Sequence, residues 1–167
     1  MPGTPDPVLG NWSLTYAVAS IVGTVVAVGP YALRENLPAP AAFSLAGGLT
    51  YALFCLGVWA GARVATVGFP VAASDQPGLL AVVLGLNALV LGSQVAVPYY
   101  LYVRSRFVAP LVGAFAATVL VLTLFLSVGG ETDPVALYPV LFGPISVVGI
   151  GLLVLAEFGV RRLLPGG

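Results

Sequence analysis

Long apolar runs alternate with short polar breaks along the whole chain. Five runs reach the length of a membrane span, and they cover residues 12–33, 41–62, 78–103, 107–128 and 135–160. At about 1.5 Å per residue, roughly 20 residues cross the ~30 Å hydrocarbon layer of a bilayer. Lipid offers no partner to a bare backbone N–H or C=O, so such runs fold as helices. The pattern predicts an all-α polytopic membrane protein, in which residues 1–167 form a single transmembrane domain with a bundle of five helices.

The polar breaks indicate how these helices are connected. Residues 104–106 leave room only for a tight hairpin, which makes the third and fourth helices antiparallel neighbours. Residues 64–73 are apolar but too short to span, so they form either an interfacial or re-entrant segment or a continuation of the second helix. Pro139 and Pro144 predict a bend or a late start in the fifth helix, because each proline leaves a carbonyl without its helical donor.

Composition removes several classes of site. The chain is 59% hydrophobic and only 7% charged, against about 25% charged in soluble domains. With no His, no Lys and one Cys, we expect no metal site and no cofactor. Six basic residues balance six acidic ones, which argues against nucleic acid as a partner. The expected partners are the lipid bilayer and other membrane protein chains or a second copy of this one.

The arginines predict the orientation. Five of them fall on one side of the five predicted spans: Arg34, Arg104, Arg106, Arg161 and Arg162. The sixth, Arg63, falls in a break on the other side. Because cytoplasmic loops carry the excess of Lys and Arg, this bias predicts a multi-pass cell-membrane protein with its N-terminus outside and its C-terminus inside. Trp59 and Tyr138 then fall near the outer interface, where aromatic belts form.

The third helix carries the most polar membrane-interior face. Asn87 and Gln94 are two helical turns apart and share a face, with Ser93 beside it. Such a face could line a path for a solute or water. It could equally form hydrogen bonds between helices. The second interpretation is favoured, because the other predicted helices offer few polar groups to complete a path.

Glu157 is the only carboxylate inside a predicted span. An acid in a membrane raises the hypothesis of a proton relay or an ion site. Glu157 lies four residues before Arg161, which is the favourable order for a helical pair, and near the inner interface. We therefore predict an interfacial ion pair between Glu157 and Arg161.

Small residues predict close helix packing. Gly57 and Gly61 form a Gly-x-x-x-Gly spacing on the second helix, and Gly85 and Gly92 lie on the third. This spacing lets two helices approach closely. In a chain with 21 glycines, packing inside the bundle is the favoured interpretation over dimerisation.

A weak internal repeat links the first and third helices. Residues 26–40 and 95–110 share Val-Ala-Val, Pro-Tyr, Arg and Ala-Pro elements at a shift of about 70 residues, with small gaps. This is either a parallel duplication, as in some transporters, or convergence on residues that suit one interface.

No nucleotide-binding, zinc-protease or nucleophile-elbow motif occurs in the sequence, so we predict no enzyme. A lipid-modifying enzyme would need an acid pair or a nucleophile that the basic inner side does not supply. The favoured hypothesis is a non-catalytic subunit or accessory protein of a larger membrane assembly. The alternative is a small transporter or channel, possibly homo-oligomeric, with its polar face at Asn87 and Gln94.

Overall fold

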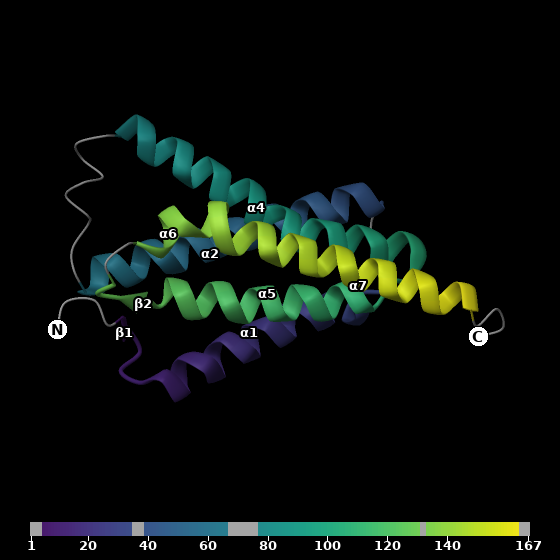
Figure 1. Ribbon diagram of the computed structural model, residues 1–167, viewed down its shortest axis with the longest axis horizontal. Coiled ribbons are helices and arrows are strands. Elements are labelled where there is room, and N and C mark those ends of the chain that lie inside the picture. The colour runs from purple at the N-terminus through teal and green to yellow at the C-terminus, as the bar shows by residue number, and fades with distance from the viewer. Residues whose placement is uncertain (1–4, 35–38, 67–76, 131–132, 164–167) are drawn as a thin grey trace.

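The chain forms a bundle of five helical passes, and its computed structural model describes residues 5–34, 39–66, 77–130 and 133–163 (Figure 1). Four passes hold the helices α1 (Trp12–Ala32), α2 (Pro40–Thr66), α4 (Pro77–Ser105) and α5 (Ala109–Phe125). The fifth is broken into α6 (Pro134–Leu137), a π-helical turn η1 (Tyr138–Phe142) and α7 (Gly143–Leu163). The prediction of an all-α membrane bundle is confirmed, and η1 is the irregularity that the fifth-helix prolines predicted.

Helix α5 is the central and shortest pass. The other four passes are long and apolar enough to cross a membrane, whereas α5 has 17 residues, or about 25 Å of helix. It packs against α1, α2, α4 and α7, and Figure 1 shows it between α1 and α7. Protein rather than lipid therefore surrounds much of α5. The predicted span 107–128 was too long, because residues 127 and 128 leave the helix and form strand β2.

A short β-pairing closes the end of the bundle that is predicted to face outside. Strand β1 (Asp6–Pro7) pairs antiparallel with β2 (Ser127–Val128), and the Val8 N–H donates to the Leu126 carbonyl at 2.8 Å. These bonds satisfy backbone groups that lie beyond the end of α5. Asn11 then caps α1 by accepting a bond from the Leu14 N–H at 2.7 Å. The described chain crosses the bundle five times, so β1 and the end of α7 lie at opposite ends (Figure 1).

Helix α2 is longer than predicted. It continues to Thr66, so residues 64–66 extend the second helix, while residues 67–76 lie outside the described residues. Arg63 belongs to the last turn of α2 and is 4% exposed. Its predicted place in an outer break was wrong, because the partners described below hold its side chain inside the bundle.

Glycines set the closest helix crossings, and one of the four glycines predicted above on the second and third helices lies at such a crossing. A Cβ on Gly48 of α2 would lie 2.6 Å from the Gly92 carbonyl oxygen of α4, so Gly92 does pack between helices. The positions of Gly57, Gly61 and Gly85 have no atom of another segment within 4 Å of an added Cβ. For these three glycines, packing inside the chain was the wrong prediction, because they face away from the bundle.

The two most extensive helix contacts are those of α1 with α5 and of α2 with α4. The shift of about 70 residues relates α1 to α4 and α2 to α5. The contact of α1 with α5 therefore corresponds to the contact of α4 with α2. The hairpins differ, because α4 and α5 pack together whereas α1 and α2 make almost no contact. The duplication therefore stays a prediction, and the separation of α1 from α2 leaves a groove.

Adding one methyl group at the α2–α4 crossing tests this packing. We expect Gly48→Ala to lower the free energy of unfolding by about 1–3 kcal/mol, because the new Cβ meets a backbone oxygen that cannot rotate away. Thermal unfolding in detergent, followed by circular dichroism, measures the change. The matched control is Gly57→Ala on the same helix, where the methyl group enters open space; equal effects would contradict the crossing.

Candidate functional site

Asn87 links α4 to the broken fifth pass. Its side chain is fully buried, and its Nδ2 donates to the Val135 carbonyl at 2.7 Å and to the Val83 carbonyl of its own helix at 2.8 Å. Val135 lies four residues before Pro139, which has no N–H to give it. The amide of Asn87 thus supplies the hydrogen bond that Pro139 removes from its own helix.

The same arrangement recurs between α4 and α1. The Tyr99 hydroxyl donates to the Val26 carbonyl at 2.8 Å, and Val26 lies four residues before Pro30, the proline inside α1. In each case a proline frees a carbonyl and a side chain of α4 satisfies it. Side chains of α4 therefore donate the hydrogen bonds that allow two neighbouring passes to contain prolines.

Gln94 makes the third polar contact of α4. Its Oε1 accepts a bond from the Tyr138 hydroxyl at 2.8 Å. Tyr138 is the first residue of η1, is fully buried and packs edge-on against Phe125 at 5.5 Å between ring centres. Placing Tyr138 in an outer aromatic belt was wrong, and Trp59, at 3% exposed, is also interior.

The predicted polar face therefore consists of bonds between helices. Asn87 and Gln94 both engage the fifth pass, as the favoured interpretation required. Ser93 is half-buried and donates to the Val90 carbonyl of its own helix at 2.7 Å. Ser93 therefore does not join the two amides.

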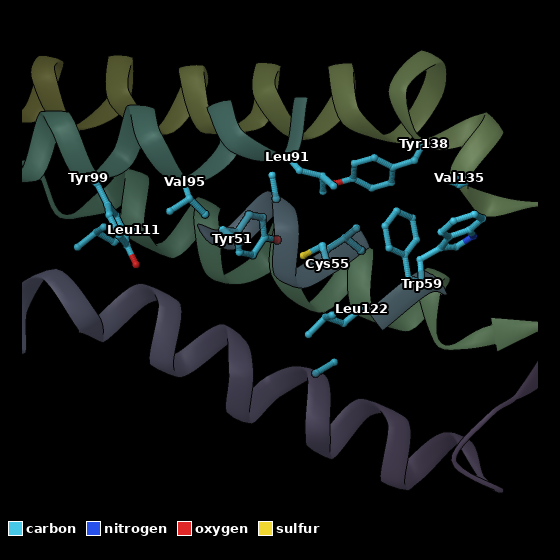
Figure 2. Packing of buried hydrophobic residues seen from close by; sticks show 14 of the residues in the cluster. Tyr51, Cys55, Trp59, Leu91, Val95, Tyr99, Leu111, Leu122, Val135 and Tyr138 are labelled. Atoms are coloured by element: carbon cyan, nitrogen blue, oxygen red, sulfur yellow. The ribbon is translucent and has the colours of Figure 1, made fainter. Parts of the chain in front are cut away.

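Some hydrogen-bonding capacity remains in this interior. Among the described residues, the Tyr51 hydroxyl, the Asn87 Oδ1 and the Gln94 Nε2 are buried without a protein partner. Figure 2 shows the Tyr51 hydroxyl directed toward Cys55, and the Tyr138 hydroxyl directed toward Leu91. Each of these atoms can therefore take one further hydrogen bond.

A partly buried ion pair fastens the predicted outer end. The Arg63 Nε lies 3.2 Å from the Asp133 Oδ2, and its Nη1 donates to the Phe125 carbonyl at 2.7 Å. The Trp59 Nε1 donates to the Asp133 Oδ1 at 2.8 Å, and Asp133 also caps α6 through the Val135 N–H. Sequence reasoning missed this cluster. The available signal was an arginine against the positive-inside trend, which needs a local partner.

A second cluster fastens the opposite end, and here the prediction is confirmed. Glu157 and Arg161 form an ion pair at 2.6 Å. The Glu157 carboxylate also accepts bonds from the Val108 N–H at 2.9 Å and the Ala109 N–H at 2.7 Å, at the start of α5. A negative charge there is favoured by the helix dipole. Arg161 in turn donates to the Ser105 carbonyl at 2.9 Å, so α7 is clamped to the turn between α4 and α5.

The described residues also enclose a groove between α1 and α2, with a volume of about 600 Å³. Val95 and Tyr99 of α4 lie at its base, and its walls are apolar apart from Thr50 and Tyr51. Asn87 and Gln94 do not line it. The groove and the polar interior of the bundle are therefore separate features.

Comparison with known proteins gives no further assignment. No protein-family model matches the chain, and no curated protein and no solved structure matches it.

Removing the Asn87 amide tests its role as a donor between helices. We expect Asn87→Ala to lower the free energy of unfolding by about 0.6–2 kcal/mol, the range for hydrogen bonds between membrane helices. Ser93→Ala is the control, because its hydroxyl bonds only its own helix, and we expect a change within about 0.5 kcal/mol. Thermal unfolding in one detergent measures both, and an Asn87 effect no larger than the control would refute the assignment.

Removing the Glu157 carboxylate tests the clamp on α5. We expect Glu157→Ala to cost about 0.5–2 kcal/mol, as loss of an N-terminal cap does, and to speed hydrogen exchange at the Val108 and Ala109 amides. Glu157→Gln keeps an acceptor but loses the charge, so its effect is smaller. Arg162→Ala on the same helix is the control. Unchanged exchange at the two amides in Glu157→Ala would show that the cap is not formed.

Proposed function

We propose that the protein is a non-catalytic subunit or accessory protein of a larger membrane assembly. The observation that carries this proposal is the use of the interior polar groups. Asn87, Gln94 and Tyr99 bond to neighbouring helices, and Asp133 and Glu157 hold helix ends. Groups engaged in this way support the bundle rather than a reaction, and they favour a protein that acts through its surface.

The lipid-facing side of α2 supports a helix of another chain as partner. Gly57 and Gly61 have open space where a Cβ would lie, and Ala65 continues the same four-residue spacing with an exposed position. Small residues at this spacing let a second helix approach closely enough for backbone contact. Since no helix in the described part of the chain packs on this face, we assign it to an assembly partner.

A second candidate function is a small transporter or channel with Asn87 and Gln94 on its path. The unpartnered Asn87 Oδ1 and Gln94 Nε2 favour it, whereas their bonds to the fifth pass count against it. In a Cys55→Ala background, a cysteine replacing Asn87 or Gln94 would react with water-soluble thiol reagents if a wet path exists. The exposed Arg104→Cys variant is the positive control. We expect labelling of the control only.

A photo-reactive side chain at Gly61 tests the assembly proposal in native membranes. We expect it to cross-link to a different polypeptide, which also co-purifies in mild detergent and is identified by mass spectrometry. The matched control is the same group at Leu152, an exposed position on α7, which should give no protein adduct. A chain that runs alone at its own mass, with no adduct at Gly61, would contradict the proposal; an adduct with itself would favour a homo-oligomer instead.

A further inference from the structure

The groove between α1 and α2 has the size and setting of a ligand site. Its volume of about 600 Å³ falls within the ~300–1,000 Å³ of small-molecule pockets. Ile21 and Val25 of α1 form one wall and are about two-thirds exposed, so the groove opens sideways. Both walls belong to helices long enough to span a membrane, so this opening faces lipid rather than water.

The lining is suited to a hydrocarbon chain. Phe43 stacks on Tyr99, with ring centres 5.3 Å apart, and the Tyr99 hydroxyl is engaged by the Val26 carbonyl. The Tyr51 ring lines the groove, while its hydroxyl is directed toward Cys55 (Figure 2). The two tyrosines therefore present ring carbon rather than free hydroxyl groups. An occupant would gain mainly by burying apolar surface.

One end of the groove lies at the end of α1, which Arg34 follows. The groove reaches Gly29 and Phe43, close to the end of α1 and the start of α2. Arg34 lies five residues beyond Gly29, with its guanidinium 4.8 Å from the centre of the Tyr31 ring. Among the described residues, Arg63 and Arg161 pair with carboxylates, whereas Arg34, like Arg104, Arg106 and Arg162, does not. The positive end of the α2 dipole adds to this potential.

We propose that this groove holds an acyl chain of an anionic phospholipid, whose phosphate lies at Arg34. The apolar walls recognise the chain, and Arg34 with the N-terminus of α2 recognises the headgroup. This site is distinct from the Gly57–Gly61 face, so the lipid proposal goes beyond the assembly proposal and does not depend on it.

Lipid retention by the whole protein tests the groove. The protein is reconstituted in vesicles of equal phosphatidylglycerol and phosphatidylcholine, extracted in mild detergent and examined by native mass spectrometry. We expect retained phosphatidylglycerol, reduced several-fold by Thr50→Phe, which fills the groove. Leu49→Phe is the matched control, because it adds a ring to the neighbouring position outside the lining. Val25→Trp fills the groove from the other wall, so a folding defect in one variant does not decide the result.

The headgroup is tested separately. We expect Arg34→Gln to remove the preference for phosphatidylglycerol over phosphatidylcholine. Arg162→Gln is the control and keeps the preference, because the Arg162 guanidinium also lies over an aromatic ring, that of Phe158, but away from the groove. Equal retention in wild type and both groove-filling variants would overturn the proposal. So would a polypeptide adduct from a photo-reactive group at Ile21, because a partner helix would then occupy the groove. The assembly proposal is tested by cross-linking from Gly61 and not by lipid retention. Failure of one proposal can therefore be distinguished from failure of the other.

Discussion

A backbone carbonyl inside a membrane bundle needs a hydrogen-bond donor, and lipid cannot supply one. Pro30 and Pro139 each remove the helical donor of a carbonyl four residues earlier. Tyr99 and Asn87 of α4 provide the replacements. This constraint explains why the most polar helix of the chain lies against the two passes that contain Pro30 and Pro139. It also explains why polar groups that resemble a pathway in sequence hold the bundle together in three dimensions.

The charged residues solve the corresponding problem at the two ends. Asp133 receives bonds from Arg63 and Trp59 and caps α6, while Glu157 receives the first N–H groups of α5 and pairs with Arg161. A helix end leaves several backbone groups without intrahelical partners, and α5 is too short to bring its ends fully to water. One carboxylate at each end of the bundle therefore completes the packing around this central helix.

Much of the fold could be predicted from the sequence, because span length and polar breaks depend only on position along the chain. The roles of Asn87 and Glu157 were also predictable, since polar groups in a membrane need partners and an i,i+4 pair is local. The sequence does not indicate which glycines pack between helices. Gly48 and Gly61 look alike, because their helix is apolar on every side. Arg63 was misplaced because its partner, Asp133, is 70 residues away.

The most direct test of this account is a double-mutant cycle between Asn87 and Pro139, measured by reversible unfolding in detergent. If Asn87 is present to satisfy the carbonyl freed by Pro139, then Pro139→Ala restores a helical N–H and makes Asn87→Ala less damaging. The account predicts a coupling free energy of about 0.5–2 kcal/mol of that sign. Additive effects of the two substitutions would show that the amide and the proline are independent, and would contradict it.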